Sequence, residues 1–246
     1  DCTSDGPFNY LGTFTQNRDV LIVDDRKSFF SKTPALQPND VCEIRKVMFN
    51  FGESKEIIAN FDINYKGNKY EKLFYLSNSL NETQRNQIIR DNYIENGYEL
   101  IDYKIINNHK DSASINLIYN AKSDKILAEY RKEIIFSVLP FKIPDFEDIK
   151  NRQCPVQIDY PINMIDIIEF DLQKDYEILT SFNNQSIRNK YGSYDINYTL
   201  QNEKIKVTKC FILNAGEYSI EEYSSFYNFI ERIKELELNN KIILNK

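Results

Sequence analysis

The residues able to do nucleophilic or metal chemistry are few and widely separated along the chain. The single histidine, His109, lies in a polar run, Asn-Asn-His-Lys-Asp, between two expected strands. As a base it would need a nucleophile and an orienting group beside it. We therefore expect His109 to be an exposed turn residue, and we expect no enzyme activity from this chain by itself.

The cysteines show no Cys-x-x-Cys spacing; they are Cys2, Cys42, Cys154 and Cys210. This spacing excludes the usual zinc-ligand and thioredoxin-type interpretations. Three disulfide pairings and the free thiols all remain open. The acidic clusters at 24–25 and 145–148 lack the spacing and the glycine of a dedicated calcium loop, which favours solvated turn carboxylates. The sequence therefore predicts neither a metal site nor a cofactor.

Aromatic residues are abundant, with 17 Tyr and 16 Phe in 246 residues and no Trp. Exposed rings on a β-sandwich could stack on sugars, so a glycan-binding module is one alternative function. Most of the rings, however, fall at core-facing strand positions, which favours core packing.

The charge and the length of the chain limit its partners. A formal net charge of −6 argues against nucleic acid, because phosphate binding needs a concentrated basic surface. No apolar run approaches the roughly 20 residues that span a bilayer, so we expect no membrane span in this chain. A chain of 246 residues suits one large β domain or two smaller ones.

Period-two alternation of apolar residues predicts most of the strands. It is clearest in 194–200 and 204–213, which should form a hairpin, although Lys209 interrupts the second run. The same pattern covers 56–66, and 98–106 with 112–120 should form another hairpin. A turn at 66–68 is expected to end the first of these strands.

Two segments carry helix signals. Residues 79–96 should form a helix that begins at Ser79 or Asn81, with Gly97 after its end. Residues 219–236 should form another, with a capping box between Ser219 and Glu222 and an apolar face at spacings of three and four. We therefore expect an all-β fold, mainly an antiparallel β-sandwich, with two peripheral α-helices.

The composition of the chain changes near its proline-rich segment 34–40, which we interpret as a linker. Residues 1–38 should be the tail of one domain. Residues 39–246 should form a β-sandwich module that could divide into halves at 39–150 and 151–246.

Several short motifs in the last third carry a resemblance to a known family. In order along the chain they are Cys154-Pro-Val, Tyr160-Pro161, Tyr191-Gly-Ser-Tyr194, Gly216-Glu-Tyr and Lys241-Ile-Ile-Leu244. This order resembles the C-terminal module of secreted transglutaminase-like proteins that are common in Bacteroidetes. Those proteins carry a β-rich domain before a papain-like transglutaminase core and another after it.

The resemblance also covers the start of the chain. Asp1-Cys2-Thr3 is similar to the Asp-Ala-Thr tripeptide in which the family places the aspartate of a Cys-His-Asp triad, and Leu21–Asp24 is similar to a later strand of the core. The resemblance thus implies that Asp1 stands at the catalytic aspartate, that Cys2 replaces a small alanine, and that residues 1–38 are the last strands of the core.

The cysteine and histidine of such a triad lie upstream in the family. The resemblance therefore implies a non-catalytic module that scaffolds or binds a partner, first of all the upstream transglutaminase-like core, in the periplasm, in the medium or at the cell surface. An alternative is one subunit of a split or nicked transglutaminase or protease, in which Asp1 orients the histidine of an upstream fragment.

Overall fold

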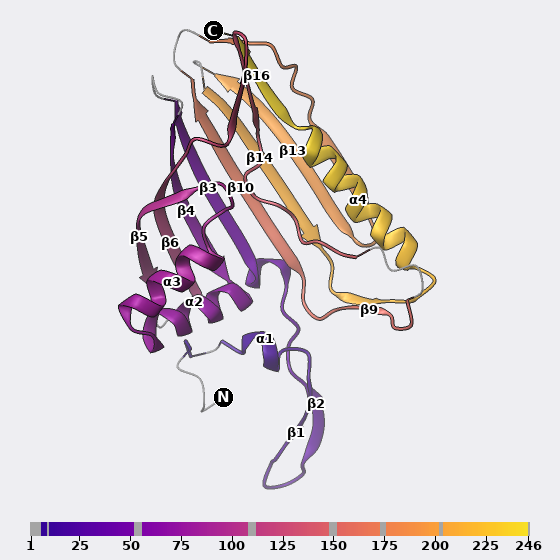
Figure 1. Ribbon diagram of the computed structural model, residues 1–246. Helices are drawn as coiled ribbons and strands as arrows, with labels where there is room; N and C mark the ends of the chain where they lie inside the picture. The colour runs from indigo at the N-terminus through magenta and orange to yellow at the C-terminus, as the bar shows by residue number, and fades with distance from the viewer. Residues whose placement is uncertain are drawn as a thin grey trace.

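The computed structural model of the chain describes residues 6–8, 10–51, 56–107, 112–147, 152–172, 176–201 and 204–245. Asp1, Cys2, Thr3 and His109 lie outside these ranges. A main sheet of eight strands dominates the molecule (Figure 1). Its strands, in spatial order, are β12 (Gln185–Asn189), β13 (Gly192–Gln201), β14 (Lys204–Leu213), β10 (Ile162–Asp171), β3 (Cys42–Phe51), β4 (Ile57–Lys66), β6 (Ser114–Ser123) and β5 (Glu99–Asn107).

The strand pairing is antiparallel except at one place in the main sheet. The expected hairpins β13–β14 and β5–β6 both form, with a bulge in β5 at Ile101. The exception is β10, which pairs with β3 in parallel. Since β3 lies in segment 39–150 and β10 in segment 151–246, this pair joins strands from both segments in one sheet.

Shorter strands form a second layer over one face of the main sheet. Four of them make a small sheet, in the order β11 (Glu177–Ile178), β16 (Lys241–Asn245), β8 (Glu133–Ser137) and β7 (Leu127–Tyr130). Two more, β9 (Val156–Ile158) and β15 (Gly216–Tyr218), pair with each other. The expected all-β, mainly antiparallel, sandwich-like fold is thereby confirmed.

The number of helices was predicted too low. The described residues contain four α-helices, α1 (Gly12–Thr15), α2 (Gly67–Ser79), α3 (Glu82–Asn92) and α4 (Tyr223–Asn239), and one 3-10 turn, η1 (Pro38–Asp40). The expected turn at 66–68 is instead the start of α2. Gly67 has φ +61°, a conformation that L side chains rarely adopt, and this lets the chain pass directly from β4 into the helix. The buried residues Tyr70, Leu73 and Leu76 then hold α2 on the core.

The helix expected at 79–96 is shorter at both ends. Asn81 is its N-cap: the Asn81 side chain accepts from the Gln84 amide at 3.0 Å, and the Gln84 side chain accepts from the Asn81 amide at 3.3 Å. This capping box satisfies two amides that the first turn leaves free. Leu80 is extended, so it separates α3 from α2.

The C-terminal helix begins at Tyr223, four residues later than expected. Only half of the predicted box forms: the Glu222 carboxylate accepts from the Ser219 amide at 3.1 Å, but the Glu222 amide donates to the Ser219 backbone oxygen. The ring of Tyr218 stacks on Phe226 with centroids 5.5 Å apart, rather than on Tyr223 as expected of a staple. The predicted apolar face is correct, because Phe226, Ile230 and Ile233 are buried.

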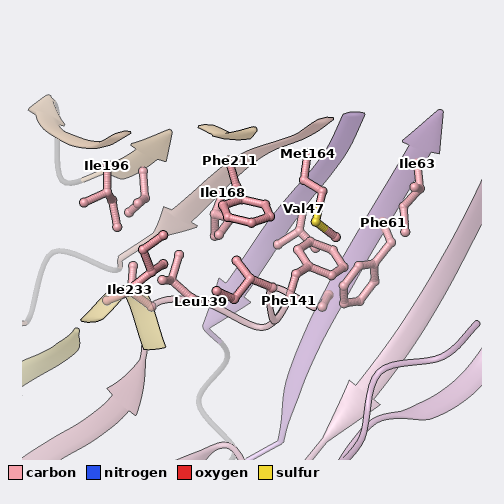
Figure 2. Packing of buried hydrophobic residues seen from close by; sticks show 14 of the residues in the cluster. Val47, Phe61, Ile63, Leu139, Phe141, Met164, Ile168, Ile196, Phe211 and Ile233 are labelled. Carbon is pink, nitrogen blue, oxygen red and sulfur yellow. The ribbon is translucent and has the colours of Figure 1, made fainter. Parts of the chain in front are cut away.

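Helices α2, α3 and α4 and the small sheet bury one continuous core against the main sheet. Figure 2 shows side chains of the main sheet, among them Ile168, Phe211 and Phe61, facing Leu139, Phe141 and Ile233 of the covering layer. None of the helices in the described residues combines the length and the apolarity needed to cross a membrane.

Candidate functional site

Three charged residues lie side by side in the middle of the main sheet, on its covered face. Arg45 of β3 is the register partner of Asp166 of β10, and Asp166 is the register partner of Lys209 of β14. Their side chains are buried. Because neighbouring strands lie about 4.8 Å apart, this register places one anion directly between two cations. We call these three residues the charged row.

Hydrogen bonds saturate the charged row. Arg45 donates from Nε and Nη2 to the two carboxylate oxygens of Asp166, at 2.5 and 2.9 Å. Lys209 Nζ lies 2.8 Å from Asp166 Oδ2, 2.9 Å from the backbone oxygen of Phe141 and 2.9 Å from Glu237 Oε1. All three ammonium donors of Lys209 are therefore used, and they tie α4 and the segment around Phe141 to the main sheet.

The electrostatics of the row favour the charged forms of Asp166 and Arg45. Burial by itself would raise the pKa of Asp166, but Lys209 and Arg45 outweigh it and hold that pKa below its usual value. Burial would lower the pKa of Arg45, but Asp166 and Glu43 raise it. The Arg45 guanidinium also lies 4.2 Å from the centroid of the Phe141 ring. A carboxylate with a lowered pKa and saturated oxygens is a poor general base, so the row is suited to holding elements together.

The network continues from the row toward the surface. Arg45 Nη1 lies 3.6 Å from Glu43 Oε1, which is 3.0 Å from Lys69 Nζ on α2. Glu95, in the segment after α3, has a raised pKa because its burial outweighs the attraction of Arg45 and Lys69. Glu43 and Lys69 thus link the buried charges to a groove beside α2.

This groove has a volume of about 400 Å³ and is lined by four lysines. Lys66, Lys69 and Lys72 come from the end of β4 and from α2, and Lys142 comes from the segment that follows β8. Glu43 is the only acidic side chain among the described lining residues. The apolar part of the lining includes Val41, Ile143, Pro144, Pro161 and Met164. We call it the lysine groove.

A two-stranded hairpin projects away from the main sheet (Figure 1). It consists of β1 (Asp19–Ile22) and β2 (Phe29–Lys32), which pair with each other in a sheet of their own. Four of the five apolar residues in its strands are exposed, Leu21 by 54%, Ile22 by 41%, Phe29 by 49% and Phe30 by 84%, and Val20 is half-buried.

The base of this hairpin is fixed to the module. The buried Gln16 donates to the backbone oxygen of Asp159 at 3.0 Å and accepts from the Leu36 amide at 3.2 Å. Just before it, the Thr13 hydroxyl donates to the Glu71 carboxylate of α2 at 2.7 Å. The hairpin is therefore held in a defined direction relative to α2.

The site residues expected from the sequence belong neither to the charged row nor to the lysine groove. Asp1, the one expected catalytic residue, and His109 lie outside the described residues. Cys42, Cys154 and Cys210 are free thiols, and burial raises the pKa of Cys42 and Cys210. Within the described residues, no three His, Cys, Asp or Glu side chains are grouped to hold a metal ion.

Sequence reasoning missed the charged row, although its signal was visible. Lys209 stands in phase with Val207 and Phe211, Asp166 with Ile168, and Arg45 with Val47, all on the buried face of their strands. A charge in phase with core residues needs a buried partner. Three charges in such positions therefore predict that they are buried next to one another.

Comparison with known proteins covers the C-terminal part of the chain. Residues 132–244 match the family model of a domain of unknown function with a solved structure, DUF3858. The matched segment includes Asp166, Lys209 and α4, whereas Arg45, α2 and the β1–β2 hairpin precede it. No curated protein matches the chain. In its C-terminal part the chain is similar to this family.

Proposed function

We propose that this chain is a non-catalytic module of a secreted transglutaminase-like protein and that it holds the preceding core domain through the β1–β2 hairpin. The observation that carries the proposal is the exposure of apolar side chains on both faces of that hairpin. The resemblance of residues 1–38 to the last strands of such a core supports the same partner.

The strand register shows why the hairpin needs a partner. Leu21 pairs with Phe30 and Ile22 pairs with Phe29. Since successive strand residues point to opposite faces, one apolar pair lies on each face. Sheets with one face in water alternate apolar and polar residues, whereas strands that are apolar on both sides are covered on both sides.

An isolated two-stranded hairpin is at best marginally stable in water. Within the part of the chain that the structure describes, no strand pairs with the outer edges of β1 and β2, which are therefore open to further pairing. Added strands and a covering layer from the core domain would satisfy both needs. In this arrangement residues 1–38 supply the last strands of the core domain, the preceding part of that domain packs on them, and the anchor at Gln16 fixes the completed core relative to the sandwich.

The test is co-expression of the full chain with a transglutaminase-like core that lacks its own last two strands. We expect a stable heterodimer by size-exclusion chromatography with light scattering. The double substitution Leu21→Ser and Phe30→Ser should abolish it, because it makes one face of the hairpin polar. The matched control is Leu238→Ser on α4, which changes a side chain that is 72% exposed and far from the hairpin in sequence.

Two results would contradict the proposal. In the first, the chain forms a homodimer through the hairpin and does not bind the core, and the double substitution Leu21→Ser and Phe30→Ser restores the monomer. In the second, the purified chain turns over peptide or glutamine–lysine substrates, which would show that the chain is catalytic without a partner.

A further inference from the structure

The lysine groove holds more positive charge than its own residues balance. Glu43 is already bound by Lys69 at 3.0 Å and by Arg45 at 3.6 Å. Within the described part of the chain, no carboxylate forms an ion pair with Lys66, Lys72 or Lys142. This excess stands out in a chain whose net charge is −6.

The first turn of α2 adds to the positive potential of the groove. Lys66 is the N-cap, its side chain accepts no hydrogen bond from the helix, and the first turn contains no acidic residue. The first amides of a helix lack partners within the helix and carry about half a positive charge. Lys69 stands at the third helical position, where a cation is unfavourable. Glu43 offsets this cost at Lys69, at 3.0 Å, but it is the only acidic side chain among the described residues that line the groove.

Neutral donors and an apolar wall complete the groove. Asn68 donates to the Tyr160 hydroxyl at 2.8 Å, which joins α2 to the opposite wall and positions the Tyr160 ring. Pro161 and Ile143 lie beside them. A volume of about 400 Å³ is enough for a small organic ligand.

We propose that the lysine groove binds a small molecule through a dianionic phosphate monoester. The ammonium groups of Lys72 and Lys142 and the first amides of α2 bind the phosphate oxygens, and the apolar wall covers the organic part. A phosphate monoester suits this site because it carries close to two negative charges at pH 7 and three acceptor oxygens. A carboxylate or a sulfate ester offers only one charge to Lys66, Lys72 and Lys142, which form no ion pair with a described carboxylate.

The experiment is calorimetric titration of the full chain with glucose 6-phosphate, glucose 6-sulfate and glucose, at pH 7.5 and constant ionic strength. We expect saturable binding of the phosphate ester and weaker or no binding of the other two. Lowering the pH to 5.5 should weaken binding of the phosphate ester, because its second proton binds near pH 6.

Matched variants separate the groove from general surface charge. The double substitution Lys72→Gln and Lys142→Gln should weaken phosphate binding at least about tenfold, the scale of lost charge-assisted hydrogen bonds. Lys46→Gln with Lys104→Gln removes the same charge from exposed positions on the other face of the main sheet and should leave binding unchanged. The four substituted lysines, Lys72, Lys142, Lys46 and Lys104, are all exposed, and equal melting temperatures will verify folding.

Three outcomes would overturn the inference: no saturable binding of the phosphate ester, equal binding of the sulfate ester, or equal loss in both double variants. The inference does not depend on the proposed function. The variant with Leu21→Ser and Phe30→Ser should bind the phosphate ester normally, so failure of the hairpin proposal and failure of this one are distinguishable.

Discussion

Asp166→Asn is the sharpest test of the charged row, because Asp166 is the anion shared by both buried cations. The substitution conserves shape but removes the charge, and it can place an amide donor against a cation. Among the described carboxylates, Arg45 would keep an ion pair with Glu43 alone, at 3.6 Å, beside its contact with the Phe141 ring. Lys209 would keep Glu237 and the backbone oxygen of Phe141, each at 2.9 Å.

The expected loss of stability follows from the interactions that Arg45 and Lys209 would lose. Removing one partner of a buried ion pair costs about 3–5 kcal/mol, and hydrogen bonds to charged groups contribute about 1.5–3 kcal/mol each. We expect Asp166→Asn to lower the free energy of unfolding by about 3–5 kcal/mol. For a chain of this size that corresponds to a fall in Tm of roughly 10 °C.

The matched control is Asp171→Asn on the same strand. Asp171 also faces a lysine across β10–β14, with its Oδ2 2.8 Å from Lys204 Nζ, but both side chains are at least 44% exposed. Exposed ion pairs contribute about 0–1 kcal/mol, so this variant should unfold almost as the wild type does. Urea unfolding followed by circular dichroism measures both.

The pH dependence of the folding stability provides a second test, and its direction can be predicted. The pKa of Asp166 is lower in the folded than in the unfolded chain, so the unfolded state binds the proton first as the pH falls. The stabilisation by Asp166 is fully present above about pH 4, the ordinary range of an aspartate, and is lost below it. The difference between wild type and Asp166→Asn should be constant from about pH 5 to pH 8 and shrink in acid. A variant within about 1 kcal/mol of the wild type at pH 7 would refute the reasoning.

Two further pairs of substitutions test the packing of the helices by urea unfolding. Ile230→Ala should lower the free energy of unfolding by about 2–5 kcal/mol, because it leaves a cavity at a fully buried position of α4. Glu231→Ala should lower it by less than about 0.5 kcal/mol. Equally small effects of the two substitutions would mean that α4 is not packed on the core. Gly67→Ala should lower the free energy of unfolding by about 1–3 kcal/mol more than Gly97→Ala does. Both glycines have positive φ, but only a Cβ at Gly67 would lie 2.9 Å from Val41 Cγ1. Equal costs would show that this contact relaxes freely.

Spacing along the sequence determined which side of each element its residues take. The alternation in 204–213 identified β14 and its buried face, and the spacing of Phe226, Ile230 and Ile233 identified the buried face of α4. Asn81 was recognised as a possible helix cap from its side chain and the positions that follow it. These features are local, because they depend on backbone periodicity and on hydrogen bonds within a few residues.

Helix α2 was missed because its local signals conflict. Gly67 follows a strand and resembles a turn residue, and the buried stripe of Tyr70, Leu73 and Leu76 is narrow. Contacts of α2 with β4 and β6 supply the stability that propensity does not.

Only the tertiary structure decided the partners of the buried charges and the exposure of the hairpin. Arg45 and Asp166 are 121 positions apart, and they meet because β3 and β10 pair in parallel in one register. Likewise, the apolar pattern of β1 and β2 is what a buried strand would show, and only the fold reveals that nothing in the described residues covers it. The sequence determines which face of a strand a residue occupies, whereas its neighbours across the sheet depend on how distant strands pair, which no local pattern encodes.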